Sequence, residues 1–357
     1  MPILPEALVN AFPRVPLATL PTPVFAINGQ RALDRDAIQR GSSANADIWR
    51  DVWVKHDGRC SKLYAGNKVR KLEYLLADAQ NQGAQHIVTL GGAGSNHAVA
   101  TSTYAHHLGM RCTACLSHQP PGAIATLNLR RHVALGTQLY VYEQFRDALD
   151  HAHTLAQAED TVLVPLGGSA PLASLGYVSA AYELATQVAN GELPQPERIY
   201  VACGTMGTAV GLAIGMTLLD WPTQVVAVRV TERGVASPHK FSALYEHSVA
   251  LLKSTVPSLP LDATLHPDRV LFVDDFFGTA YAEPTPEALD AIEFARTAGL
   301  NLDGTYTGKA FAALTAHRQQ AQFDGPALFW CTLNAVDTPL AEIDALASLG
   351  EDFARYR

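Results

Sequence analysis

The residues in this sequence best suited to chemistry are three closely spaced cations, Lys68, Arg70 and Lys71, at the start of an expected helix. A helix start is already electropositive, so each cation there costs roughly 0.3–1 kcal/mol unless an anion lies close by. On a helical wheel, Lys68 lies near the apolar side, Lys71 lies to one side of it, and Arg70 lies nearly opposite. We therefore interpret Lys68 as an inward-facing amine that serves as a nucleophile, and Arg70 as a surface residue. The alternative is a solvated basic turn.

The helix itself is predicted from its apolar residues. Four of them recur at the i, i+3, i+4, i+7 spacing of one buried face: Leu72, Leu75, Leu76 and Ala79. Asn67 is placed to cap this helix, and Gly83 is placed to end it.

A glycine cluster, Gly91, Gly92 and Gly94, precedes a second expected helix that begins at Ser95. A strand followed by a glycine turn and a helix start exposes free backbone amides, so a phosphate or a carboxylate is the expected guest. The alternative is that Ser95 only caps the helix. The G-x-G-x-x-G fingerprint of dinucleotide-binding proteins is incomplete, because His97 stands where its last glycine belongs.

A second loop of this kind consists of Gly204, Thr205, Met206, Gly207 and Thr208. Its glycines allow close backbone approach and its threonine hydroxyls add donors, which suits a phosphate, although a tight connection would explain it too. The segment GTYTGKA at 304–310 differs from the phosphate loop of nucleotide hydrolases, because it is one residue short and lacks the residue that binds Mg²⁺. Two anion sites without a Mg²⁺ motif, together with an inward lysine, indicate a phosphorylated cofactor and a carboxylate substrate. Pyridoxal 5'-phosphate fits this combination.

No metal site is expected from the cysteines and histidines. The five cysteines are odd in number and scattered, which is typical of reduced thiols rather than of disulfides. Cys112 and Cys115 lie on an expected strand, where a separation of three residues points them to opposite faces. None of the 13 histidines has metal-ligand spacing with cysteine or acidic residues.

The composition limits the kinds of molecule that the protein is expected to bind. With 357 residues, of which 48% are hydrophobic, the chain is long enough for a large core in two domains or in one large domain. A net charge of -8, without a run of more than two Lys or Arg residues, argues against nucleic-acid and anionic-membrane partners. No apolar run reaches the roughly 18 residues of a membrane span, and the first residues do not resemble a signal peptide. We therefore expect a small substrate and a cytoplasmic location.

Strands and helices are expected to alternate along most of the chain. The expected strands are the apolar runs at 51–56, 86–90, 111–116, 138–142, 161–166, 198–203, 224–230, 270–275 and 327–332. The expected helices lie near 95–108, 122–135, 144–158, 172–189, 206–219, 238–253 and 285–298. This alternation predicts an α/β fold with parallel sheets covered by helices. The polar stretch Gly29–Ala46 is expected to be a surface excursion.

Several segments, taken in order, resemble the family of D-cysteine desulfhydrase and 1-aminocyclopropane-1-carboxylate deaminase. They are AGNKVRKLEYL, GGAGSNHA, LGGSAPLASLGYVSAAYEL, CGTMGTAVGL, YAEPTPEALDAI and DGTYTGKAFAAL. The resemblance implies the two-domain tryptophan-synthase-β-like fold, which is fold type II of the pyridoxal-phosphate enzymes, with the cofactor in the interdomain cleft and normally a homodimer. We expect a large cofactor-binding domain formed by 1–70 and 181–357, and a small domain at 71–180.

For the cofactor, the resemblance implies that Lys68 forms the Schiff base and that Lys71, Asn96 and the loop Gly204–Thr208 bind the phosphate. The deaminase has a glutamate that keeps the pyridine nitrogen protonated, and Thr307 stands in its place here. A hydroxyl partner leaves the pyridine less charged, which suffices when the β-substituent is already a good leaving group. Thr307 therefore favours β-elimination.

For the substrate, the resemblance implies that Ser95 lies at the substrate carboxylate and the reactive carbons, and that Tyr281 and Tyr306 face the substrate. Asn96 and His97 are expected to bind the substrate as well. From the residues alone, each tyrosine is more simply an aromatic packing residue. In the implied mechanism, the freed lysine takes the Cα proton and the two tyrosines assist the leaving group.

The expected reaction is β-elimination from D-cysteine to pyruvate, sulfide and ammonia. Thr332 supports it, since it matches a threonine of the desulfhydrases where the deaminases carry leucine. Beside it, Cys331, Leu333 and Asn334 replace the family's usual His and Gly-Gly, so that two side chains occupy space that glycines leave open. The alternatives are a lyase or deaminase for L-cysteate, 2,3-diaminopropionate or 1-aminocyclopropane-1-carboxylate, and a non-catalytic binder of a phosphorylated ligand. The incomplete fingerprint disfavours a nucleotide-dependent oxidoreductase.

Overall fold

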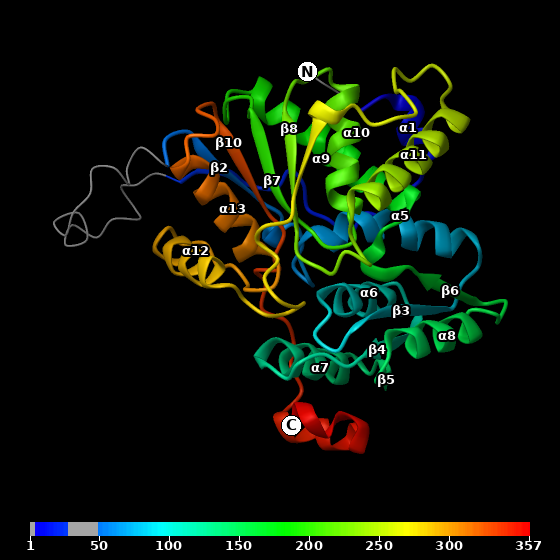
Figure 1. Ribbon diagram of the computed structural model, residues 1–357. Coiled ribbons are helices and arrows are strands. Elements are labelled where there is room, and N and C mark those ends of the chain that lie inside the picture. The colour runs from blue at the N-terminus through cyan, green and yellow to red at the C-terminus, as the bar shows by residue number, and fades with distance from the viewer. Residues whose placement is uncertain (1–3, 28–48) are drawn as a thin grey trace.

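Two sheets, one above the other in Figure 1, form the framework of the molecule. The computed structural model describes residues 4–27 and 49–357. The expected surface excursion Gly29–Ala46 lies outside the described residues.

The larger sheet has the strand order β1-β2-β10-β7-β8-β9 and is parallel except at its edge, where β1 pairs antiparallel with β2. Its strands are β1 (Val24–Ala26), β2 (Val52–His56), β7 (Arg198–Cys203), β8 (Gln224–Arg229), β9 (Val270–Val273) and β10 (Ala327–Cys331). All of them except β1 were expected from the sequence. The three-residue β1 was missed, because it is too short to show a period of two.

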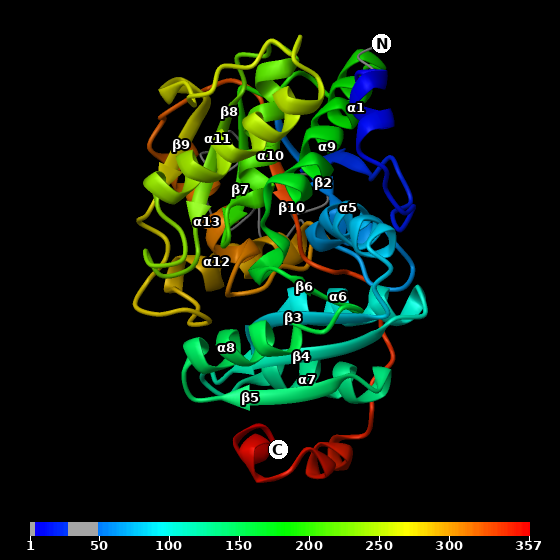
Figure 2. The same cartoon turned by 90° about the vertical axis from the view of Figure 1, so that its right-hand side faces the viewer.

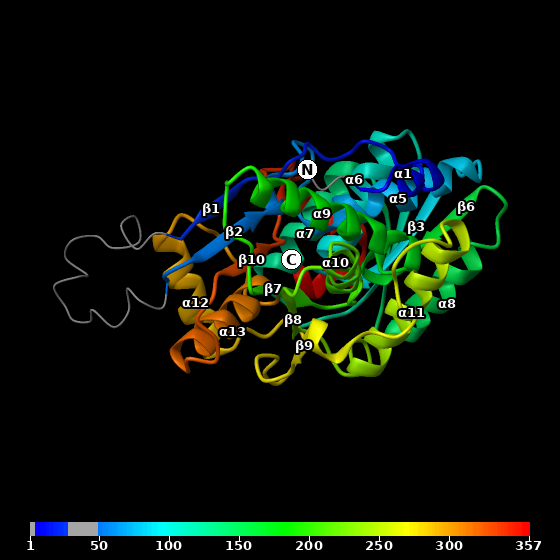
Figure 3. The same cartoon turned by 90° about the horizontal axis from the view of Figure 1, so that it is seen from above.

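Helices cover both faces of the larger sheet (Figure 3). On one face lie α1 (Glu6–Ala11), α9 (Pro171–Ala189), α10 (Gly207–Leu218) and α11 (Pro238–Thr255), and on the other α12 (Pro286–Thr297) and α13 (Thr307–Gln319). Along β7, Ile199 and Val201 join the core on the first face, whereas Tyr200 and Ala202 join the core on the second. A parallel sheet with both faces buried needs such strands, so the predicted α/β architecture is confirmed.

The smaller sheet is entirely parallel, with the strand order β5-β4-β3-β6. Its strands are β3 (His86–Gly92), β4 (Arg111–Ser117), β5 (Gln138–Tyr142) and β6 (Thr161–Val164), and its helices are α6 (Asn96–His107), α7 (Ala123–Leu135) and α8 (Phe145–Leu155). Cys112 packs with α6 and Cys115 packs with α8, so the prediction that they point to opposite faces is confirmed. Among the described residues, no helix is long and apolar enough to cross a membrane.

The last residues of the chain pack beside the smaller sheet (Figure 2). Two 3₁₀ helices, η4 (Ile343–Leu349) and η5 (Glu351–Tyr356), bury Leu346 and Phe353 against Leu129 of α7. These residues belong to the range assigned by sequence to the large domain, although they contact the small one. The domain boundaries stay a prediction.

The helix that carries the three cations, α5 (Asn67–Asn81), already includes Asn67, so Asn67 is not its cap as predicted. Gly66 occupies the N-cap position with φ +101°, a conformation that favours glycine. Asn67 is the first helical residue instead, and its side chain donates to Thr208 Oγ1 at 3.0 Å. At the other end, Gly83 follows the helix with φ +76°, as predicted.

Arg70 corrects the interpretation made from the helical wheel. Its side chain is buried, at 1% relative exposure, rather than on the surface. The wheel assigned α5 one buried face, but α9 covers the side that was expected to face solvent. Arg70 is tolerated there because Asp57 and Glu183 accept its hydrogen bonds.

Gly176 sets how closely α9 approaches α5, which gives a prediction. A β-carbon at this position would lie 2.1 Å from the carbonyl oxygen of Arg70. We expect Gly176→Ala to force the helices apart and to lower the free energy of unfolding by roughly 1–3 kcal/mol. Denaturant titration measures this, with Gly234→Ala as the control, because a β-carbon there would meet nothing within 4 Å. Equal stability of the two variants would contradict the close packing.

Candidate active site

A cavity of about 360 Å³ opens where β3 and β7 end, between the two sheets. Its lining contains most of the residues singled out by sequence: Lys68, Lys71, Ser95, Asn96, His97, Gly204, Thr205, Met206, Thr208, Tyr281, Tyr306 and Thr332. Gly207 belongs to the same loop without lining the cavity, and Thr307 does not line it either. The structure therefore brings together segments that are far apart in the chain.

Lys68 lies in the first turn of α5, half-buried in the cavity wall. The described residues offer its Nζ no hydrogen-bond acceptor and no carboxylate partner. Burial lowers the pKa of its ammonium group to about 8. A substantial fraction of the amine is thus neutral near pH 8, which is the state in which it acts as a nucleophile or a base.

This lowered pKa gives a second prediction. On protein freed of any cofactor, an amine-acylating reagent should label Lys68 with a midpoint near pH 8, whereas exposed lysines titrate at about 10.4. Peptide mass spectrometry across a pH series measures both rates, with the exposed Lys62 as the internal comparison. Parallel labelling curves for the two lysines would contradict the prediction.

Lys71, by contrast, is buried and already bonded. Its Nζ donates to the carbonyl oxygen of Gly167 and to Ser169 Oγ, both at 3.2 Å. Burial, followed by the charge of Lys68, holds its pKa well below the usual lysine value. An anion placed beside this ammonium would relieve both penalties.

The loop Gly204–Thr208 lies directly against Lys71. A β-carbon on Gly207 would come within 3.1 Å of Lys71 Nζ and within 2.8 Å of Ser169 Oγ, so a larger residue would displace these two side chains. Met206 has φ +66°, and α10 begins at the next residue with its first amides unpaired within the helix. Together, these groups form a cradle of hydrogen-bond donors that could hold a phosphate.

Ser169 completes this cradle and was missed as a site residue. Its hydroxyl accepts from the amide of Gly207 at 3.2 Å and bonds Thr205 Oγ1 at 2.7 Å. The signal in the sequence was the glycine pair before it, in the segment LGGSAPLAS. Gly167 has φ +63°, and a β-carbon there would collide with Thr205.

The glycine turn before α6 is compatible with both interpretations made from sequence, a helix cap and an anion site. Ser95 caps the helix, since its Oγ accepts from the amide of Ala98 at 3.2 Å, and it also lines the cavity. Asn96 is held by Tyr64, whose hydroxyl donates to its Oδ1 at 3.3 Å, and by Asn128. A fixed amide and the open start of α6 suit a carboxylate.

His97 is buried behind this turn. Among the described residues its Nδ1 has no hydrogen-bond partner, and its Nε2 lies 3.4 Å from Thr89 Oγ1. Burial, with the charges of Lys68 and Lys71, holds the pKa of His97 well below its usual range. The ring is therefore neutral at physiological pH and adds no charge to the cavity.

Tyr281 and Tyr306 face each other across the cavity wall. Their hydroxyls are hydrogen-bonded, and their rings meet edge to face with centroids 6.1 Å apart. Burial raises the pKa of both phenols. The pair thus stays protonated and can supply a proton to a group in the cavity.

Thr307 does not line the cavity, so its expected place beside the cofactor stays a prediction. Its hydroxyl donates to Asp303 Oδ2 at 2.8 Å and accepts from the Asp303 amide at 2.8 Å. Asp303 lies just before α13, and its carboxylate accepts hydrogen bonds from the free amides at the start of that helix. Asp303 lines the cavity instead, and burial raises the pKa of its carboxyl group.

Leu333 and Asn334 both line the cavity next to Thr332. The Asn334 side chain is turned toward the backbone, where its Oδ1 accepts from the amides of Ala65 and Val336 at 2.9 and 3.1 Å. Leu333 thus contributes the apolar part of this wall. Asn334 instead supports the loop that leads into α5.

Another part of the wall was not anticipated from sequence. It is lined by Ser117, His118, Gln119, Phe145 and Glu232. Gln119 accepts from the amide of Gly94 at 2.9 Å, and its own backbone is bonded to the hydroxyl of Tyr356 near the end of the chain. No local pattern pointed to these residues, because they meet the cavity only through contacts between distant segments.

The described residues contain no group of three His, Cys, Asp or Glu side chains that could hold a metal ion.

Comparisons with known proteins agree with this geometry. The family model described as pyridoxal-phosphate dependent enzyme matches residues 39–332. Nocardicin C-9' epimerase of Nocardia uniformis subsp. tsuyamanensis is 33% identical over 335 residues, covering 91% of this chain and 93% of its own. D-cysteine desulfhydrase of Salmonella choleraesuis is 32% identical over 339 residues, covering 91% of this chain and 95% of its own.

Solved structures are similar over the whole fold. A homologue of ACC deaminase, 27% identical in sequence, superposes with a TM-score of 0.76 and covers 93% of this chain and 96% of its own. The processed form of threonine deaminase isoform 2 from Solanum lycopersicum has a TM-score of 0.61 at 14% identity, covering 98% and 92%. The second similarity concerns the fold alone.

Proposed function

Because the chain belongs to the pyridoxal-phosphate-dependent enzymes, we propose that it catalyses β-elimination from a small β-substituted amino acid. D-cysteine, which would yield pyruvate, sulfide and ammonia, is the first candidate. The observation that carries the proposal is the amine of Lys68, which has no hydrogen-bond partner among the described residues, in a cavity that also holds the protonated Tyr281–Tyr306 pair. An amine that can take a proton and a phenol that can give one are the two groups that elimination needs.

The residues present fit pyridoxal 5'-phosphate. The Lys68 amine is free to bond the aldehyde, and the loop Gly204–Thr208 with Lys71 and Ser169 provides donors for the phosphate. When bound, this cofactor withdraws electrons from the α-carbon of an amino acid and so weakens the bonds to it. Substrate choice among such enzymes is then decided by the protein groups around that carbon.

These groups divide the work. Ser95 and the open start of α6 would hold the substrate carboxylate, which would fix the position of the α-carbon in the cavity. Lys68, with its lowered pKa, would take the Cα proton. The pair Tyr281 and Tyr306 would donate to the departing β-substituent, such as thiolate sulfur, as its bond to carbon breaks.

One second candidate is favoured by a specific observation. The similarity to a protein named nocardicin C-9' epimerase supports inversion at a stereocentre, for which we propose the α-carbon of an amino acid. Proton removal by Lys68 would be the same, but a second acid would return the proton from the opposite side. A β-substituent that leaves poorly would favour this outcome.

The experiment is a substrate screen on the protein loaded with cofactor. Keto acid and sulfide are assayed with D-cysteine, L-cysteine, L-cysteate, 2,3-diaminopropionate and 1-aminocyclopropane-1-carboxylate. Exchange of the Cα proton is followed by NMR in D₂O. Pyruvate from D-cysteine supports the first candidate. Exchange without keto acid supports the epimerase, and the absence of both overturns the two in favour of a non-catalytic binder.

The remaining implications of the resemblance stay proposals. We expect a homodimer in the cytoplasm, with a large domain at 1–70 and 181–357 and a small domain at 71–180. Light scattering, cell fractionation and limited proteolysis test these three points separately.

A further inference from the structure

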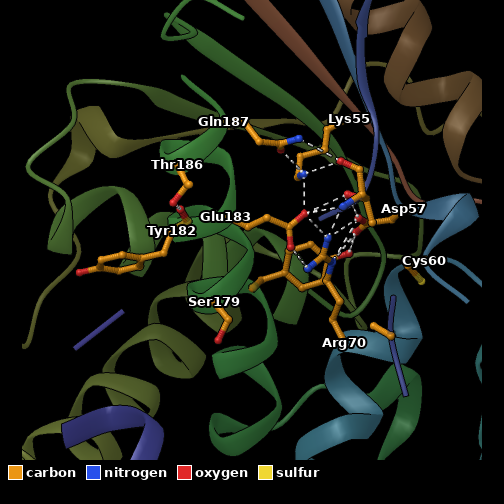
Figure 4. Close-up of polar contacts among 12 residues, drawn as sticks. Lys55, Asp57, Cys60, Arg70, Ser179, Tyr182, Glu183, Thr186 and Gln187 are labelled. Carbon is orange, nitrogen blue, oxygen red and sulfur yellow. Dashed lines mark hydrogen bonds and ion pairs between the residues drawn. The ribbon is translucent and has the colours of Figure 1, made fainter. Parts of the chain in front are cut away.

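Four charged side chains form a buried cluster behind the start of α5 (Figure 4). This charge cluster consists of Lys55 on β2, Asp57 in the 3₁₀ turn η1 (Asp57–Arg59), Arg70 on α5 and Glu183 on α9. Lys55, Asp57 and Arg70 are at most 1% exposed. None of the four lines the cavity. Two cations face two carboxylates, so the cluster carries no net charge.

Arg70 is the centre of this cluster. Its Nε lies 3.1 Å from both carboxylate oxygens of Asp57, and its Nη2 lies 2.8 Å from Oδ1. Its Nη1 donates to Glu183 Oε2 at 2.9 Å, and Lys55 donates to Glu183 Oε1 at 2.6 Å. A planar guanidinium with several fixed acceptors has little freedom to rotate.

Asp57 is fixed just as firmly. Besides Arg70, its carboxylate accepts from the hydroxyl of Tyr177 at 2.5 Å and from Trp330 Nε1 at 2.8 Å. Its backbone carbonyl oxygen accepts from the amide of Gly66 at 2.9 Å. Asp57 thus bonds the chain on both sides of Lys68, two residues before it and two residues after it.

A buried ion cluster of this size is not needed for stability alone. Apolar residues of similar volume often stabilise a core as well or better, because the charges must first be dehydrated. What the cluster adds is a fixed orientation of the groups that it joins, because charge-assisted hydrogen bonds restrict orientation more narrowly than apolar contacts do. The segment that it orients is the turn that carries Lys68.

We propose that Arg70 and Asp57 are positioning residues, which hold the first turn of α5 so that the Lys68 amine stays directed into the cavity. The inference rests on the proposed function, in which Lys68 bonds the cofactor and moves the Cα proton. Arg70 acts through the backbone of α5 and touches neither cofactor nor substrate. Lys71 and His97 lie close enough to Lys68 for its charge to lower their pKa. The other titratable groups that line the same cavity are Tyr64, His118, Glu232, Tyr281, Asp303 and Tyr306, and none of these groups belongs to the cluster.

The test compares Arg70→Lys with Tyr177→Phe in the protein loaded with cofactor. Lysine keeps the charge but cannot make the bidentate contact, whereas Tyr177→Phe removes another donor to the same Asp57 carboxylate without loosening α5. Three readouts are measured: the pH midpoint of the cofactor absorbance, the pH midpoint of Lys68 labelling after cofactor removal, and kcat and KM with the best substrate. Melting temperatures show how far each variant is destabilised.

For Arg70→Lys we expect both midpoints to shift and kcat to fall roughly 10–100-fold with KM little changed. Tyr177→Phe should leave the midpoints unchanged at a similar loss of melting temperature. Shifts of equal size in the two variants, or none in Arg70→Lys, overturn the proposal. If Arg70→Lys does not fold, Glu183→Gln replaces it in the test, because this variant weakens the contact between α9 and Arg70. Unshifted midpoints in Glu183→Gln would again overturn the proposal. A wild-type protein without turnover overturns the proposed function, while the two midpoints still decide the positioning role.

Discussion

Replacing Lys68 with alanine is expected to lower kcat by about 10³-fold or more, because under the proposed function the reaction would lose its base and the cofactor would lose its covalent attachment. The amine has no hydrogen-bond partner among the described residues and lies half-buried at the cavity wall, so its removal leaves no buried group unsatisfied. Stability should therefore stay close to that of the wild type. The measurements are steady-state rates, borohydride reduction followed by mass spectrometry, and a melting curve.

The control for this variant is Lys62→Ala, which removes an exposed lysine six residues earlier in the chain. It should retain full activity and the covalent adduct after borohydride reduction. A Lys68→Ala protein that keeps wild-type turnover, or that still becomes covalently labelled at full yield, would exclude Lys68 as the functional amine.

Replacing Asp57 with alanine is expected to lower the free energy of unfolding by about 3–5 kcal/mol. The change leaves the Arg70 guanidinium buried with only Glu183 as a charged partner, and it removes the acceptor of Tyr177 and Trp330. The pKa of Asp57 is held below its usual range because Arg70 and Lys55 outweigh the opposing effect of burial, so the carboxylate is ionised throughout the neutral pH range. Denaturant unfolding at pH 7 measures the loss.

Asp78→Ala is the matched control, because Asp78 is an exposed aspartate on α5 itself. Its effect should stay within about 0.5 kcal/mol, as for most surface substitutions. If Asp57→Ala costs no more than this control, the charge cluster contributes nothing to the stability of the fold.

Much of the site could be predicted from sequence, since its parts are locally encoded. The apolar spacing in α5 aims Lys68 inward, and the glycine loops before α6 and α10 follow from turn chemistry within a few residues. The strand and helix alternation likewise predicted the parallel sheets. These features depend on interactions between residues close in the chain, so a sequence pattern is enough to find them.

What the sequence by itself determined was that Lys68 faces inward and that two glycine loops precede helix starts beside it, where we propose that anions bind. The tertiary structure alone decided which groups surround them. Arg70 can be buried because Asp57 and Glu183 accept its hydrogen bonds, and these partners lie 13 and 113 residues away in the chain. Gln119, which lines the cavity, is likewise held by Tyr356, 237 residues later. Whether a charged group or a hydroxyl is exposed, paired or buried depends on residues that folding brings next to it from distant parts of the chain. The local pattern of the sequence therefore does not predict it.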